Sequence, residues 1–135
     1  MLPSPSHPAS KILDFAQLPM RPTPVGEFRP LFDGPTATLT NLEGHITTLH
    51  AGEAPHAPHR HPDEELVIVK EGTMEATING VAQRGGPGSI FFFASNDLHG
   101  MKNVGGTEAT YYVFRSITDA TPKADPAPAA AKSNQ

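Results

Sequence analysis

The stretch HRHPDEELVIVKEG, residues 59–72, combines two histidines, a pair of carboxylates and an apolar run. Because successive side chains of a strand point to opposite faces, His59 and His61 are expected on the same face. A proline then ends this strand, and Glu64 and Glu65 open the apolar run, so that a carboxylate reaches the imidazoles from a neighbouring strand. Two imidazoles on one face can share a metal ion. The alternative is a solvated loop whose histidines are balanced by acidic residues.

Short strands separated by turn residues fill the chain from residue 36 to residue 117. Their side chains alternate between apolar and polar or are continuously apolar, and 15 prolines and 12 glycines interrupt the sequence. Asn79-Gly80 is the strongest hairpin signal, since both residues tolerate positive φ. About six to eight short strands without a long amphipathic helix predict a single all-β domain, either a sandwich or a small barrel.

The two ends differ from this strand-rich domain at residues 36–117. Residues 1–35 are rich in proline, and we interpret them as an irregular arm that packs on the outside of the domain. An arm exchanged between two subunits is the alternative. Residues 118–135 consist largely of small and polar residues with no large apolar side chain. Such a segment cannot offset the entropy of ordering, so we expect a disordered tail.

Composition argues against several classes of protein. The formal net charge is −4, whereas nucleic-acid-binding proteins neutralise phosphates with Lys and Arg. No apolar run reaches the roughly 18 residues of a membrane-spanning helix, and the absence of cysteine removes disulfides and thiolate metal sites. The first residues do not resemble a signal peptide, so we expect a cytoplasmic protein. The mature form of an exported, periplasmic protein is the alternative.

A third histidine occurs much later, in the stretch DLHGMKN, where we expect His99 on a separate strand. Three neutral imidazoles and one carboxylate form a nitrogen and oxygen ligand set that suits Mn, Fe, Co, Ni or Zn. Taken alone, a histidine on a strand is more often a hydrogen-bonded polar residue than a ligand, and that alternative stays open for each of them.

With these residues in view, the sequence resembles the cupin superfamily. The first cupin motif is G(X)5HXH(X)3,4E(X)6G, and the chain matches it at His59, His61, Glu65 and Gly72. The upstream Gly52 stands one residue further from the first histidine than the motif asks. The count of six residues to the closing glycine selects the second of the two adjacent glutamates.

The second cupin motif, G(X)5PXG(X)2H(X)3N, is matched by Gly88, His99 and Asn103. In place of P-X-G the chain has Ala94-Ser95-Asn96, which is a departure from the motif. Asn is the residue best able to replace Gly at positive φ, so we expect the turn to be kept. The two motifs and the stretch between them cover nearly all of the predicted domain.

The resemblance implies a small single-domain cupin, or monocupin, whose fold is a double-stranded β-helix, also called a jelly-roll barrel. It implies that His59, His61, Glu65 and His99 hold one divalent transition metal inside the barrel: Fe, Mn, Ni, Co, Cu or Zn. The remaining coordination positions would be left to water, substrate or dioxygen. Glu64 would then face outward.

Further residues are candidates for the surroundings of the metal. We expect His56 to line the entrance or act as a base beside Glu65, with a surface loop as the alternative. The phenylalanine run 91–93 is expected in the core, and one face of it, Phe91 and Phe93, can line an apolar substrate cavity together with Met101. His45 and His50 are assigned packing or surface roles.

Three functions fit these expectations, and the fold does not choose between them. The first is a dioxygenase-like oxidoreductase that acts on a small, aromatic or enolisable substrate. The second is a metal-dependent isomerase or hydrolase, in which His56 or Glu64 moves a proton. The third is a non-catalytic module that binds a small ligand. Since the run LVIVK is apolar on both faces, we also expect its outer face to be covered by the arm or by a second subunit, as in a homodimer.

Overall fold

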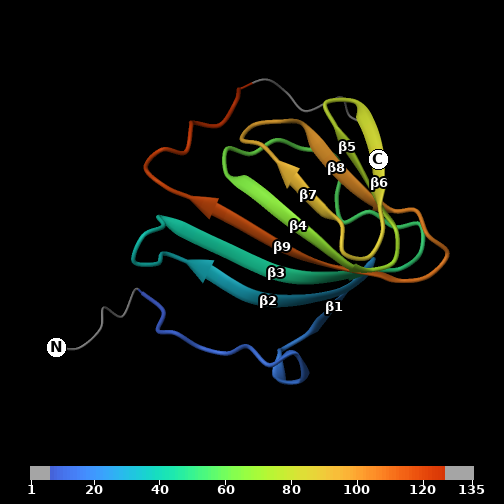
Figure 1. Ribbon diagram of the computed structural model, residues 1–135, viewed down its shortest axis with the longest axis horizontal. Coiled ribbons are helices and arrows are strands. Elements are labelled where there is room, and N and C mark those ends of the chain that lie inside the picture. Colours follow the sequence, from blue (N-terminus) through green and yellow to red (C-terminus); the bar gives the residue numbers. More distant parts are fainter. Residues whose placement is uncertain (1–6, 127–135) are drawn as a thin grey trace.

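The computed structural model describes residues 7–126, and within them the chain is almost entirely strand and loop (Figure 1). Two antiparallel sheets face one another, one of six strands in the order β1-β2-β3-β9-β4-β7 and one of three in the order β6-β5-β8. The predicted jelly-roll barrel is confirmed. The elements are η1(Phe15–Gln17), a 3-10 turn, and the strands β1(Arg21–Thr23), β2(Gly26–Gly34), β3(Asn41–Leu49), β4(Glu64–Glu71), β5(Met74–Ile78), β6(Val81–Gly85), β7(Ile90–Phe93), β8(His99–Asn103) and β9(Ala109–Ile117).

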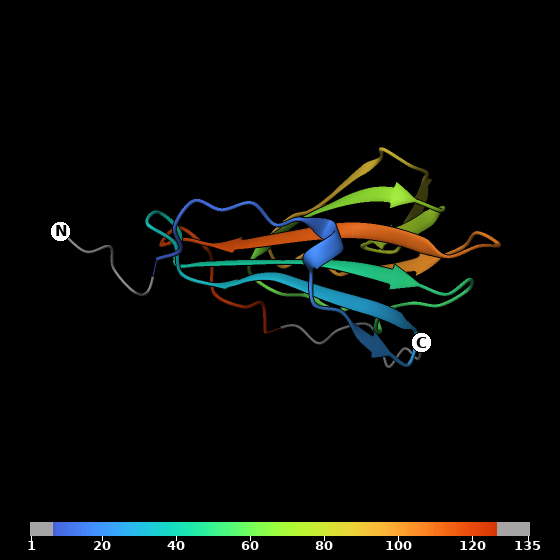
Figure 2. The ribbon, with the colours of Figure 1, turned by 90° about the horizontal axis from the view of Figure 1, so that it is seen from below.

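The larger sheet is built on long pairings between strands far apart in sequence. β3 pairs with β9 from Asn41↔Ile117 to Leu49↔Ala109, and β9 pairs in turn with β4. Figure 2 shows β2, β3 and β9 running side by side. In the smaller sheet, Asn79 and Gly80 have φ of 47° and 87° and join β5 to β6, which confirms the predicted hairpin.

The core lies between the two sheets and follows the alternation of the strands. On β4 the residues Val67 and Val69 are buried, whereas Leu66 and Ile68 on the other face are 44% and 37% exposed. The buried apolar cluster comprises Leu49, Val67, Val69, Met74, Ala76, Phe93, Ala109, Tyr111 and Val113. The outer face of β4 is therefore apolar and open to solvent in the single chain.

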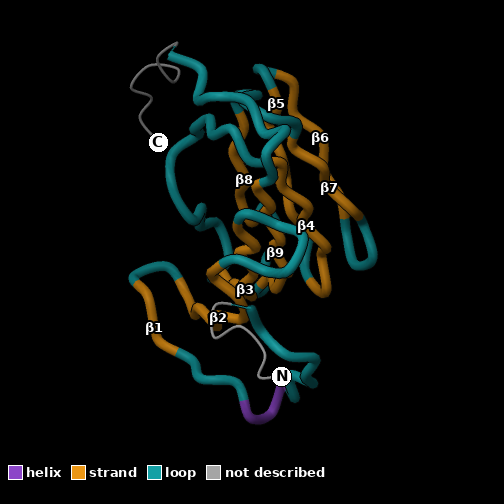
Figure 3. Tube along the Cα trace, turned by 90° about the vertical axis from the view of Figure 1, so that its left-hand side faces the viewer, coloured by secondary structure: helices purple, strands orange, loops and turns teal. Residues whose placement is uncertain are grey.

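The segment interpreted as an irregular arm contains two strands, β1 and β2, and β2 pairs along its length with β3. Its prolines are compatible with this position. Pro22 lies on an edge strand, and Pro30 lies at a register shift in β2, the two places where a strand tolerates a missing N–H. The preceding residues pack against β2, with Lys11 over the ring of Phe32, on the side of the molecule away from β7 (Figures 1 and 3).

The tail predicted to be disordered begins at residue 118, and its described part extends to residue 126. Thr118 and Thr121 form a turn directly after β9, in which the N–H of Thr121 donates to the Thr118 carbonyl at 3.1 Å. Residues 127–135 lie outside the described part of the chain. No helix among residues 7–126 is long and apolar enough to cross a membrane.

Candidate metal centre

The first two histidines of the sequence motif lie on an extended segment that pairs with β8 at one point. The N–H of His59 donates to the carbonyl of His99 at 2.9 Å, and the reverse bond is 3.0 Å. The expected strand around them is reduced to this isolated bridge, and a proline stands before it, at Pro58, and after it, at Pro62. The bridge places His59 and His99 side by side.

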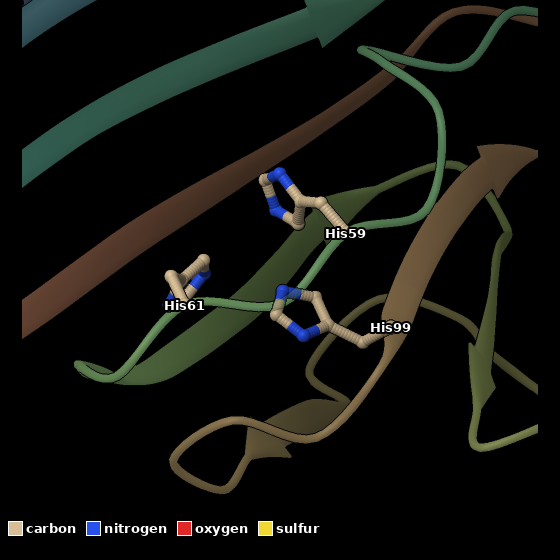
Figure 4. A group of neighbouring side chains, drawn as sticks. All are labelled: His59, His61 and His99. Atoms are coloured by element: carbon tan, nitrogen blue, oxygen red, sulfur yellow. The ribbon is translucent and has the colours of Figure 1, made fainter. Parts of the chain in front are cut away.

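His59, His61 and His99 converge between the sheets (Figure 4). One ring nitrogen of each lies within 4.8 Å of the others. The three ring centroids are 4.8 to 5.0 Å apart, and each pair of rings is nearly perpendicular, so the rings meet edge to face without stacking. This separation suits three imidazoles around a single ion.

Glu65 adds a carboxylate to the three imidazoles. Its Oε1 lies 2.9 Å from Nε2 of His61 and 3.5 Å from Nε2 of His99. Glu65 is only 7% exposed, whereas its neighbour Glu64 is on the exposed face of β4. The first residues of β4 thus direct one carboxylate into the cluster and the other into solvent.

Hydrogen bonds on the far side of two rings fix which nitrogen faces the centre. The Nδ1 of His61 lies 2.9 Å from both the carbonyl and Oδ1 of Asp63, and the Nδ1 of His99 lies 2.9 Å from the carbonyl of Asp97. An imidazole that donates through Nδ1 presents the lone pair of Nε2, which is the form that binds a metal. Nε2 of His99 is buried without a hydrogen-bond partner among the described residues. A metal ion would satisfy that atom, so the residues present fit a metal.

The electrostatics of the cluster agree with this assignment. Burial, together with the neighbouring imidazoles, lowers the pKa of His59 to about 4, which keeps the ring neutral near pH 7. Burial opposes both charges in the pair of Glu65 and His61, but their mutual hydrogen bond outweighs it. The pKa of Glu65 is therefore lowered, and that of His61 is raised.

Neighbouring residues support the cluster without contributing ligands. Phe93 is fully buried and stacks on the ring of His99 at 4.2 Å and 8°. Asn103, the last residue of the second motif, is also buried and donates through Nδ2 to the carbonyls of Leu49 and Thr107. These contacts anchor both ends of β8. Asn96 has φ 64°, so the turn expected in place of P-X-G is kept.

The comparisons with known proteins agree with this architecture. The family model described as "Cupin domain" matches residues 45–115. The chain belongs to the cupin family. Among solved structures, a RmlC-like cupin from Shewanella frigidimarina is 18% identical and has a TM-score of 0.66, with 83% of this chain and 95% of that chain covered.

Two further structures resemble this cupin with similar sequence identity and TM-score. KdgF from Halomonas sp. is 17% identical, with 82% of this chain and 97% of that chain covered and a TM-score of 0.64. A sugar phosphate isomerase of the cupin superfamily from Silicibacter pomeroyi is 21% identical, with 80% and 76% covered and a TM-score of 0.64. At such identities the likeness shows the fold alone. A search of curated proteins found no significant match.

A cavity of about 460 Å³ opens beside the histidine cluster of this cupin. Met101 lines it, and so does His56, whose ring is 4.1 Å from that of His59. Of the other two expected lining residues, Phe93 lies beneath His99, and Phe91 lines a second cavity of about 440 Å³ between β6 and β7. The phenylalanine run therefore does not form the wall of the cavity beside the cluster.

Two residues of the cavity wall were not predicted from the sequence, which assigned His45 a packing or surface role and gave Arg115 no role. His45 lines the cavity, with Nδ1 2.7 Å from Oε2 of Glu43 and its ring stacked on Phe28. Arg115 also lines it and donates through Nε to Oδ2 of Asp63 at 2.7 Å. The period-two pattern of β3 could have placed His45 on the inner face. The pairing with Arg115 joins residues 52 positions apart and has no local signal.

Proposed function

We propose that this cupin binds one divalent transition metal through His59, His61 and His99, with Glu65 as a fourth ligand. The observation that carries the proposal is the convergence of three ring nitrogens within 4.8 Å. The orphaned Nε2 of His99 and the lowered pKa of His59 support it. Nitrogen and oxygen donors of this kind suit Fe, Mn, Co, Ni, Cu or Zn.

We further propose a metal-dependent oxidoreductase, dioxygenase-like, that acts on a small aromatic or enolisable molecule. The metal, when bound, supplies Lewis acidity and, if it is redox-active, electron exchange. The cavity beside it has apolar walls that include Leu49, Met101 and Val113, which would hold an apolar substrate body and exclude water. His56 and Arg115 lie in the same wall and can donate hydrogen bonds to substrate oxygens.

A metal-dependent isomerase is the second candidate, and the pair of His45 and Glu43 favours it. A carboxylate on Nδ1 orients an imidazole and leaves Nε2 to take or give a proton, and His45 lies in the cavity wall. The sugar phosphate isomerase among the similar structures is compatible with such chemistry on this fold.

Oxygen consumption separates these candidates. We expect protein loaded with Fe(II), Mn(II) or Co(II) to consume oxygen in the presence of phenols or enolisable ketones, and the variant His99→Ala not to do so. Turnover of sugar phosphates or ketones by the Zn-loaded protein without oxygen would overturn the oxidoreductase in favour of the isomerase. Binding of such molecules without any turnover would leave a small-ligand-binding cupin.

A homodimer is proposed on separate grounds. Ile90 and Phe92 on β7 pair with Ile68 and Leu66 on β4, and these four side chains, 37% to 59% exposed, form one apolar strip on the outer face of the larger sheet. The arm packs at the opposite, β2 side of that sheet, so a second copy is the proposed cover. Sedimentation should show a dimer that Phe92→Arg weakens, whereas Val81→Arg, on β6, leaves it intact.

A further inference from the structure

After β9 the chain turns at Thr118 and runs back toward the loop that precedes β8, as Figure 1 shows for the red end of the chain. We refer to residues 118–125 as the C-terminal strap. In that loop, the side chain of Asn96 contacts the strap. The Nδ2 of Asn96 donates to the carbonyl of Lys123 at 2.8 Å, and the N–H of Asp125 donates to Oδ1 of Asn96 at 3.0 Å. The amide thus pairs with the strap backbone as a neighbouring strand would.

The same asparagine is bonded to the segment that carries the first two histidines. Its N–H donates to the carbonyl of His61 at 2.8 Å. Its carbonyl accepts a hydrogen bond from Nη1 of Arg60 at 3.2 Å, and another contact of Arg60 reaches the Asp125 carboxylate at 3.9 Å. His99 follows three residues later in the chain. Asn96 therefore connects the strap to both histidine-bearing segments.

Asn96 is one of the two positions at which this turn departs from the cupin motif. The motif has glycine where this chain has Asn96, and φ is 64°, in the left-handed region that glycine occupies without strain. Asn tolerates that region better than most residues, and its short amide can also form hydrogen bonds. Glycine would keep the turn but could not bind the strap.

We propose that the C-terminal strap, through Asn96, clamps the two histidine-bearing segments together and slows the release of the metal. Asn96 is thereby a positioning residue, and the inference rests on the metal site proposed above. Residues that orient metal ligands typically change affinity by about 10- to 100-fold when they are replaced. Because the strap is exposed and acts on the ligands only through Asn96, we expect the release rate to change by about tenfold, the lower end of this range.

The test compares full-length wild type with Asn96→Gly, which keeps the turn, and Asp125→Pro, which removes from the strap both the N–H bonded to Asn96 and the carboxylate near Arg60. The control is Ala124→Ser, which lies between the two strap contacts and leaves both bonds in place. Transfer of Co(II) from the protein to an excess of chelator gives the release rate. Hydrogen exchange of the metal-free proteins reports on residues 59–61 and 94–99. We expect release to be about tenfold faster in both test variants, with faster exchange in both segments and no change in the control.

Equal release rates and equal exchange in all four proteins would contradict the proposed role of the strap, but they would not contradict the metal site. Faster exchange with unchanged release would likewise overturn the proposed effect on the metal. If wild type itself retains no Co(II), the metal site fails and this inference with it. The exchange data would then show separately whether the strap orders the loop.

Discussion

Replacing Asp63 by Asn tests how the structure holds the ring of His61 in place. The carboxylate accepts from Nε of Arg115 at 2.7 Å through one oxygen and lies 2.9 Å from Nδ1 of His61 through the other. In the Asp63→Asn variant one of these oxygens becomes an NH₂ group, which can only donate. Whichever way the amide is turned, either Arg115 or His61 then faces a donor.

The size of the effect follows from these two bonds. A hydrogen bond to a charged group contributes about 1.5–3 kcal/mol, and one of the two is lost in the variant. The Asp63 carbonyl still accepts from His61, and the Arg115 side chain is 32% exposed, so water replaces part of the loss. We expect the unfolding free energy of metal-free protein to fall by about 2 kcal/mol, and metal affinity to fall about tenfold.

The pH dependence gives a further check. Burial opposes the charge of Asp63, but the hydrogen bond and positive charge of Arg115 outweigh it and lower the carboxyl pKa below its ordinary 3.8. A carboxylate with a lowered pKa stabilises the fold above its unfolded-state pKa and loses that effect as the pH falls. The stability difference between wild type and Asp63→Asn should therefore persist at mildly acidic pH and shrink as the pH falls below about 4.

Urea unfolding and chelator competition measure these quantities. The matched control is Asp97→Asn, because Asp97 orients His99 through its main-chain carbonyl, which the substitution leaves unchanged. An Asp63→Asn protein that equals wild type in stability and in metal affinity would contradict this explanation. So would an Asp97→Asn protein that loses as much as Asp63→Asn.

Further outcomes follow from the same structure. Glu65→Gln should weaken metal binding at least about tenfold, whereas Glu64→Gln on the exposed face should not, as isothermal titration with Co(II) or Zn(II) would show. Phe93→Ala should lower the unfolding free energy in urea by about 3–5 kcal/mol, since the ring is fully buried against His99; a loss below about 1 kcal/mol would contradict the packing. Burial opposes a proton on His61, but the hydrogen bond to Glu65 outweighs it and raises the pKa of His61 above 6.5, so a proton competes with the metal there. Chelator competition should therefore show affinity falling as the pH drops through neutrality, and a flat profile would argue against His61 as a ligand.

The sequence is informative about this site where the ligands are close together in the chain. His59 and His61 are separated by one residue, so an extended chain places their side chains on the same face. The spacing of the cupin motif then selects Glu65. Periodicity alone could not choose between the two glutamates, because Pro62 interrupts the strand. In the structure the first carboxylate of β4 faces solvent and the second faces the cluster.

Residues brought together by sheet register could not be found from sequence. Arg115 meets Asp63 because β9 pairs with β4. Proline content also misled the interpretation of the arm. Proline has a low strand propensity, so its presence argues against a strand. In the structure, however, Pro22 lies on an edge strand and Pro30 at a register shift, where proline is tolerated.

The metal centre is tested most simply by elemental analysis of purified protein beside the double variant His59→Ala/His61→Ala. His50→Ala, which replaces an exposed histidine, is the matched control. We predict about one transition-metal ion per chain in wild type and in the control, and loss of that ion in the double variant. If all three proteins contain no metal after incubation with Fe, Mn, Co, Ni, Cu and Zn, or if the double variant retains the ion, the proposed metal centre is contradicted.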